Sequence, residues 1–294
     1  MTGTSLEKLN NNNPFPTVPM TSDAKPRLQP DASARLELLA SAVLKAGELA
    51  RYSLKRRRIT EMLAKAPRDY QTEIDVAVER IIVDEMIKAF PDYAIQGEEA
   101  VGNRQAGPDT PIIYIDPIDG TTNYAWGIPH FGMTISIAEH GKVVAGVVYD
   151  AMLDELFSAE VGRGAYLNGE KISCIDNGDI ENVLIGAGLP VPGQVKALKK
   201  ETYLSALQRL MDQTAGVRRL GSAALSIAYV ACGRLDGFFE DGLSLHDYGA
   251  SALLVEEAGG KVSAFSGGPV TPNGDILAAN TAVHSWLVDG FRGG

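Results

Sequence analysis

The sequence has few of the features that mark secreted or membrane-spanning proteins. Only two cysteines, Cys174 and Cys232, occur among 294 residues, and their spacing is not that of metal ligands. We therefore expect no disulfide framework, a reducing cytoplasmic location and two small buried side chains. No apolar run reaches the length of a membrane span, and no apolar signal-peptide core stands near the N-terminus.

The chain also lacks an excess of basic residues. It contains 27 Lys and Arg against 37 Asp and Glu, which gives a formal net charge of −10. Non-specific nucleic-acid binding usually needs a basic face, so the composition argues against direct nucleic-acid contact. A phosphorylated substrate remains compatible with this charge, because a bound metal ion can supply positive charge locally.

Large apolar side chains are scarce in residues 1–30, which are rich in Asn, Pro, Thr and Ser. This composition predicts a flexible N-terminal extension. The remainder, residues 31–294, shows no linker and no internal repeat, and 45% of the whole chain is hydrophobic. We therefore predict one domain over residues 31–294 with a sizeable core.

Two helices are predicted at the start of this domain. The first begins at a cap on Asp31 or Ser33 and runs to about Arg58, with apolar residues at steps of three and four. The second follows Thr72, which with Asp75 fits a capping box in which an acidic residue replaces Glu or Gln. Asp75 is therefore interpreted first as a capping residue.

The rest of the domain mixes strands and helices. Short β-favouring runs predict strands at 112–115, 133–138, 143–149, 156–159, 183–185, 235–239 and 276–279. His140 and Gly141 form a hairpin turn between two of them. Helices are predicted at 203–211, 222–232 and 248–258. Strands and helices do not alternate strictly, which favours a layered α+β sandwich over a simple doubly wound sheet.

One acidic motif is the most informative stretch of the chain. Asp116-Pro117-Ile118-Asp119-Gly120-Thr121-Thr122-Asn123 places two carboxylates three residues apart at the end of a predicted buried strand. Proline and glycine force a sharp turn there, where side chains and backbone groups can converge on a ligand. Two carboxylates held together repel each other unless a cation lies between them. Oxygen-only donors suit Mg²⁺, Mn²⁺ or Ca²⁺ rather than Zn²⁺.

Other acidic residues precede and follow this motif. Glu98 and Glu99 lie upstream, Glu240 and Asp241 lie downstream, and Asp247 opens the last predicted helix. A carboxylate at a helix N-terminus is also a good cap, so Asp247 alone would be interpreted as one.

Together these segments resemble the inositol monophosphatase family. The resemblance covers nearly the whole chain from about residue 35, and Asp116–Asn123 is its most specific part. It also includes Lys65, Asp69, Thr72, the loop Gly162–Gly169, the helix start at Gly221-Ser222 and the segment Glu256–Gly260. It implies a layered α/β/α/β/α fold of the inositol monophosphatase and fructose-1,6-bisphosphatase type. Lithium sensitivity and a homodimer are further implications.

The resemblance also implies roles for individual residues. Metal ligands for two Mg²⁺ ions, which Mn²⁺ can replace, would be Glu98, Asp116, Asp119, Asp247 and the Ile118 carbonyl, with a weaker third ion near Glu98. Asp75 and Thr121 would activate the attacking water. Substrate contacts would come from Gly120, Thr121, Asp119, Glu240 and Asp247. Of these, Glu240 would contact the sugar-like alcohol of the substrate.

The sequence departs from the family pattern beside the last ligand, where His246 stands in place of tryptophan. We interpret His246 as a space-filling or substrate-contacting residue rather than a ligand, because Asp247 already matches that role. Near Ser244 animal members often carry a histidine, so substrate contacts there are expected to differ. Arg218 and Arg219 are interpreted as supporting the fold or a subunit interface.

The predicted function is hydrolysis of inositol monophosphate or a related polyol phosphate by a metal-activated water. Related enzymes act on histidinol phosphate, fructose 1,6-bisphosphate or the 3′-phosphate of adenosine bisphosphates, so these alternatives stay open. A different class also stays open: some bacterial relatives bind the transcription machinery and act in antitermination and ribosome maturation. A third reading, a metal-binding stability module, would not need the Asp75 and Thr121 pair.

Overall fold

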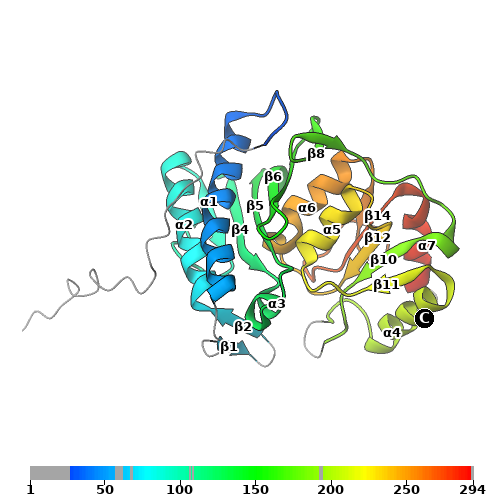
Figure 1. The fold of residues 1–294 in the computed structure, drawn as a ribbon. Coiled ribbons are helices and arrows are strands. Elements are labelled where there is room, and N and C mark those ends of the chain that lie inside the picture. Colours follow the sequence, from blue (N-terminus) through cyan, green and yellow to red (C-terminus); the bar gives the residue numbers. More distant parts are fainter. Residues whose placement is uncertain are drawn as a thin grey trace, which may run out of the picture.

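The computed structural model describes residues 27–56, 62–66, 69–105, 107, 109–191 and 195–292, with the side chains of 62–66, 69–71 and 292 left out. Figure 1 shows alternating layers of helices and sheets. One outer layer holds α1 (Ala34–Arg56) and α2 (Glu73–Ala89), the middle layer α5 (Ala223–Ala231) and α6 (Leu245–Glu257), and the other outer layer α4 (Lys200–Gln213) and α7 (Thr281–Arg292). A sheet separates each pair of layers, which confirms the predicted fold.

The larger sheet has seven strands in the order β3-β4-β5-β6-β7-β8-β9. Their bounds are Ala94–Gly97, Ile112–Asp119, Gly132–Glu139, Lys142–Asp150, Glu155–Glu160, Gly164–Leu167 and Glu170–Ile172. Strand β3 pairs with β4 in parallel, and the other pairs are antiparallel. The predicted turn between β5 and β6 is confirmed: His140 and Gly141 both have positive φ, 50° and 75°, as a type I′ turn requires.

The smaller sheet has five strands in the order β11-β10-β12-β14-β13. Their bounds are Gly216–Arg218, Leu184–Ala187, Gly237–Glu240, Ile276–Ala279 and Lys261–Ser263. Strand β10 pairs in parallel with both β11 and β12, so its two neighbours come from later, separate parts of the chain. The short hairpin of β1 (Met62–Ala66) and β2 (Asp69–Thr72), the helix α3 (Thr121–Trp126) and the 3₁₀ turn Ile180–Asn182 complete the described elements.

Local sequence explains how the first two helices begin. The Leu36 backbone N–H donates to Ser33 Oγ at 3.3 Å, so Ser33 rather than Asp31 caps α1. Thr72 and Asp75 form the predicted capping box at the start of α2. The described part of α1 ends at Arg56, and the predicted end at Arg58 lies outside the described residues. None of the described helices is long and apolar enough to cross a membrane.

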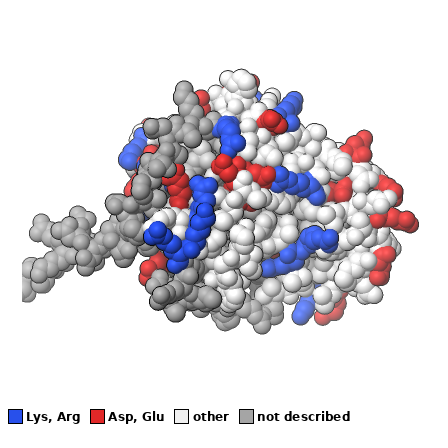
Figure 2. Space-filling model, in the orientation of Figure 1, with Lys and Arg blue, Asp and Glu red and all other residues white. Residues whose placement is uncertain are grey.

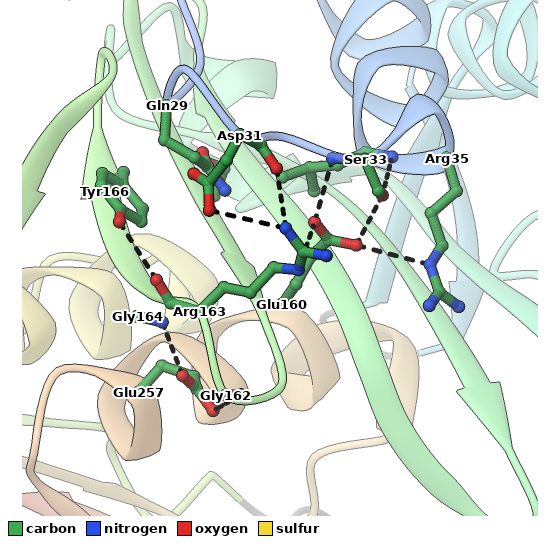
Figure 3. A network of polar contacts seen from close by, with 12 residues as sticks. Gln29, Asp31, Ser33, Arg35, Glu160, Gly162, Arg163, Gly164, Tyr166 and Glu257 are labelled. Carbon is green, nitrogen blue, oxygen red and sulfur yellow. Dashed lines mark hydrogen bonds and ion pairs between the residues drawn. The ribbon is translucent and has the colours of Figure 1, made fainter.

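The segment just before α1 is packed against the larger sheet. Gln29 is 2% exposed, and Ser158 Oγ donates to its side chain at 3.3 Å. Figure 3 shows the neighbouring contacts, in which Ser33 and Arg163 surround the Glu160 carboxylate. Gln29 is thus held by buried contacts at the end of the segment for which a flexible extension is predicted. Residues 1–26 lie outside the described part of the chain.

Candidate active site

The acidic motif lies where β4 leaves the larger sheet. The pairing of β4 with β5 shifts register between Asp116 and Asp119, and the Ile118 backbone N–H donates to Asp116 Oδ1 at 2.9 Å. This local hydrogen bond bends the chain at the strand end. Gly120 follows with a φ of 102°, and a Cβ there would lie 2.9 Å from the Gly221 carbonyl oxygen. A glycine is therefore required at position 120 for both conformation and space.

Asp119 links the end of β4 to the start of α5. Its Oδ2 accepts hydrogen bonds from Ser222 Oγ and from the Ala224 backbone N–H, the latter at 2.7 Å. Ser222 is also the N-cap of α5, because its Oγ accepts from the Leu225 N–H. A carboxylate at this helix N-terminus is stabilised by the helix dipole and by unpaired N–H groups. These contacts fix Asp119 between β4 and α5.

Asp75 faces the same motif from α2. Its Oδ2 accepts from the Thr72 backbone N–H at 2.9 Å, and the Thr72 hydroxyl also donates to it. Its other oxygen, Oδ1, lies 3.2 Å from Thr121 Oγ1. Asp75 is fully buried. The capping box therefore holds one oxygen of Asp75 and leaves the other directed at Thr121, so the capping role does not exclude the predicted functional one.

Asp247 enters from the start of α6. It forms a capping box with Ser244, whose backbone N–H donates to Asp247 Oδ2 at 2.6 Å. The other oxygen, Oδ1, lies 3.4 Å from His246 Nε2. The His246 carbonyl accepts from Thr134 Oγ1 at 2.7 Å, which fixes this turn against β5. His246 thus supports Asp247 and also lines the cavity described next.

A cavity of about 330 Å³ opens between these elements. Its walls include six of the predicted site residues: Glu98, Asp119, Gly120, Thr121, Glu240 and Asp247. The other three, Asp75, Asp116 and Ile118, lie behind this wall and contact it: Thr121 bonds to Asp75, and Asp116 is close to Glu98 and Asp247. The structure therefore brings together all the predicted site residues from five separate parts of the chain.

Two further residues on the cavity wall were not predicted as part of the site. Ser222, interpreted only as a helix start, binds Asp119 and lines the cavity. Arg219 also lines it, whereas Arg218 does not. The sequence could not separate these adjacent arginines, because only the path of the chain after β11 decides which of them faces the cavity.

Five carboxylates of the site have raised pKa values, chiefly because they are buried: Asp75, Asp116, Asp119, Glu240 and Asp247. Burial, followed by the charges of Glu98, Asp119 and Asp247, raises the pKa of Asp116 well above its usual range. Burial also raises the pKa of Asp119 to about 7 and that of Asp247 to about 6. For Asp75, burial raises the pKa to about 6 although the hydrogen bonds from Thr72 act in the opposite direction. Crowded, desolvated carboxylates of this kind are typical of functional sites.

Glu240 also lines the cavity. Burial and then the charge of Asp119 raise the pKa of Glu240 to about 8, while Arg219 lowers it. Arg219 is therefore electrostatically coupled to the residue that the resemblance assigns to the alcohol. Glu240 and Arg219 thus both line the same cavity.

The donor set fits a hard divalent cation. Within the described residues, no group of three or more His, Cys, Asp and Glu side chains is placed so that it could already hold a metal ion. The side chains of Glu98, Asp116, Asp119 and Asp247 and the Ile118 carbonyl nevertheless supply only oxygen donors. Burial, followed by repulsion from the other three carboxylates, raises the pKa of Asp116. Mg²⁺ and Mn²⁺ are bound by such donors and would remove that repulsion.

The distribution of charge on the surface bears on nucleic-acid binding. Figure 2 shows basic and acidic side chains interspersed on the visible face, with no continuous basic area among the residues drawn in colour. Phosphate backbones are bound by clustered positive charge. The visible face offers no such cluster among the residues drawn in colour.

Comparisons with known proteins agree with this geometry. The sequence model of the inositol monophosphatase family matches residues 31–292. The chain is 42% identical to Nus factor SuhB of Pseudomonas aeruginosa over 84% of this chain and 91% of that protein. It is 38% identical to inositol-1-monophosphatase of Mesorhizobium japonicum over 88% of this chain and 97% of that protein.

Solved structures give the same result. The extragenic suppressor protein suhB from Bartonella henselae superposes with a TM-score of 0.83 at 36% identity, covering 89% of this chain and 100% of that one. The Thermotoga maritima IMPase superposes with a TM-score of 0.79 at 33% identity, covering 88% of this chain and 97% of that one. This chain therefore belongs to the inositol monophosphatase family.

Proposed function

We propose that the protein is a Mg²⁺-dependent phosphomonoesterase that hydrolyses inositol monophosphate or a related polyol phosphate. The observation that carries the proposal is that Asp75 and Thr121 lie beside four acidic side chains at one cavity. These four are Glu98, Asp116, Asp119 and Asp247. A site that only bound a metal for stability would not need a water-orienting pair. Relatives named inositol-1-monophosphatase support the same reaction.

The phosphate is bound at the start of α3. Gly120 and Thr121 line the cavity, and we assign their backbone N–H groups to the phosphate oxygens. Bound divalent cations, held by Glu98, Asp116, Asp119, Asp247 and the Ile118 carbonyl, would neutralise the phosphoryl oxygens and acidify the attacking water. A third, weaker ion would lie near Glu98. The acidic protein thereby binds an anionic substrate.

The attacking water is oriented by Thr121 and deprotonated by Asp75. Thr121 Oγ1 lies 3.2 Å from Asp75 Oδ1 and 3.1 Å from the Ile118 carbonyl, so a water bound there is next to Asp75 Oδ1. The pKa of Asp75, about 6, suits a group that is ionised at neutral pH and can take up a proton. The water's proton therefore goes to Asp75 Oδ1.

The alcohol occupies the Glu240 side of the cavity. Glu240 lines the cavity, and its carboxyl oxygens can accept hydrogen bonds from hydroxyl groups. A polyol offers several such hydroxyl groups, which favours inositol phosphate over the alternatives. Histidinol phosphate, fructose 1,6-bisphosphate and adenosine 3′,5′-bisphosphate are the competing substrates.

Phosphate release from these four compounds, with and without Mg²⁺, tests the proposal. Asp116→Asn should abolish release. Asp150→Asn is the matched control: Asp150 is also a buried aspartate whose Oδ1 accepts from a backbone N–H two residues later, but it lies outside the cavity lining. Release that requires Mg²⁺ and survives only in the control supports the proposal. No release from any of the four compounds in excess Mg²⁺ contradicts it.

A second candidate function is binding to RNA polymerase as an antitermination factor. The observation that favours it is the 42% identity to a protein named Nus factor SuhB. Such a role needs a protein partner rather than direct RNA contact, in keeping with the net charge of −10. Co-purification of the polymerase with wild type and with Asp116→Asn separates the two functions, because binding that survives in the inactive variant does not depend on catalysis.

A further inference from the structure

A buried glutamate holds the loop that carries Glu98. Glu79 lies on α2 four residues after Asp75, on the same helix face, and both side chains are fully buried. The Glu99 backbone N–H donates to Glu79 Oε2 at 2.8 Å, and the Val101 N–H donates to Glu79 Oε1 at 2.7 Å. One carboxylate therefore fixes two backbone groups on either side of Ala100.

The loop is shaped to fit this carboxylate. A Cβ on Gly97 would lie 2.4 Å from Glu79 Oε1, so only glycine lets the chain pass this closely. Ala100 adopts a positive φ of 56°, which turns the following N–H groups inward. The Glu98 N–H donates to the Ile115 carbonyl at 3.0 Å, which aligns the loop with β4. Glu98 is thus held between two anchors, one on β4 and one on α2.

We propose that Glu79 is a positioning residue for the cation site: it acts on the cation through Glu98 and does not contact it. This inference rests on the proposed function, since it assumes that Glu98 is a cation ligand. Residues that orient ligands through hydrogen bonds are often needed for tight metal binding. The i, i+4 placement also means that α2 carries both the water-activating residue and the support of a metal ligand, so a shift of this one helix changes both.

The test is Mn²⁺ binding by calorimetry to wild type and to Glu79→Gln. Glutamine keeps the size of the side chain but replaces one acceptor oxygen with an NH₂ donor, which faces a backbone N–H. The dissociation constant should rise by about 10–100-fold. Because the loop is displaced and not destroyed, excess Mg²⁺ should restore kcat while the half-saturating Mg²⁺ concentration stays raised.

Glu257→Gln is the matched control. Glu257 on α6 also accepts two backbone N–H groups, from Gly162 and Gly164, both at 2.7 Å. It anchors the turn between β7 and β8 (Figure 3), and it does not line the cavity. Loss of these hydrogen bonds should lower the unfolding temperature of the Glu257→Gln variant. Its Mn²⁺ dissociation constant should stay within about twofold of wild type, because a change far from the site acts independently of it.

Each outcome decides the question. Glu79→Gln binding within twofold of wild type, or equal weakening in both variants, overturns the inference. Wild type that binds no Mn²⁺ overturns the proposed function and this inference together. If Glu79→Gln does not fold, Gly97→Ala disturbs the same contact from the loop side, and circular dichroism shows whether it is folded. A folded Gly97→Ala variant must then bind Mn²⁺ at least tenfold more weakly, and unchanged binding overturns the inference.

Discussion

The Thr121 hydroxyl lies 3.2 Å from the Asp75 carboxylate, although 46 positions separate the two residues in the sequence. Thr121 begins α3 and Asp75 belongs to the first turn of α2. The hydroxyl has one proton to share between Asp75 and the Ile118 carbonyl, so its lone pairs stay available for a water. In the proposed mechanism, this pair links metal binding to catalysis.

Removing either member of the pair should reduce turnover without preventing substrate binding. Asp75→Asn and Thr121→Ala should lower kcat about 10²–10⁴-fold, the usual contribution of a general base, with little change in KM. Thr121→Ser, which keeps the hydroxyl, should recover most of the loss. Steady-state kinetics at saturating Mg²⁺ measures this, and a Thr121→Ala enzyme with wild-type kcat would remove Thr121 from the mechanism.

Mg²⁺ should stabilise the protein through the acidic cluster. A ligand that binds only the folded state at about 100 times its dissociation constant adds roughly 2.7 kcal/mol to the free energy of unfolding. For a chain of this size that amounts to several degrees in the unfolding temperature. Scanning calorimetry with Mg²⁺ and with a chelator measures the difference.

Asp116→Asn should remove this Mg²⁺ effect and raise the unfolding temperature of the metal-free protein. Asparagine keeps the Oδ1 atom that accepts from Ile118 but removes a buried charge crowded by three other acidic residues. A Mg²⁺-dependent shift that persists in this variant would place the cation elsewhere.

The metal-free protein should lose stability as the pH rises from about 4 to about 7. Asp75, Asp119 and Asp247 have folded-state pKa values of about 6, 7 and 6, above the usual value of 3.8. Groups with raised pKa values bind protons more tightly when folded, so their stabilisation is complete below pH 4 and is lost as each folded pKa is passed. Urea unfolding at pH 5 and pH 7.5 in chelator measures the loss. A protein that is more stable at pH 7.5 would contradict these shifts.

Arg219→Ala should change how substrate binding depends on pH. The Arg219 charge lowers the pKa of Glu240, so its removal leaves more Glu240 protonated near neutral pH. The pH at which KM for inositol 1-phosphate changes should therefore move upward. Arg218→Ala is the control, because Arg218 is exposed, bonds to the Val217 carbonyl and does not line the cavity. Equal pH profiles for the two variants would show that Arg219 is not coupled to Glu240.

Local signals identified most of the elements but not the shortest ones. The strand at 276–279 has the predicted bounds, and the helices predicted at 203–211, 222–232 and 248–258 begin and end within about three residues of α4, α5 and α6. Strands β1, β2, β3, β8, β9, β11 and β13 were not predicted, because runs of three to five residues carry little periodicity. Helix α7 was also not predicted, although Val283, Leu287 and Phe291 recur at steps of four and are buried.

By itself the sequence determined the acidic motif, the capping residues of α2 and the turn at His140 and Gly141, because each depends on neighbouring residues and backbone preference. Only the tertiary structure decided which side chains meet. It placed Ser222 on Asp119, Arg219 rather than Arg218 on the cavity wall, and Glu79 under the Glu98 loop. These contacts join residues far apart in the chain, and no local pattern specifies them, because they follow from how the layers pack.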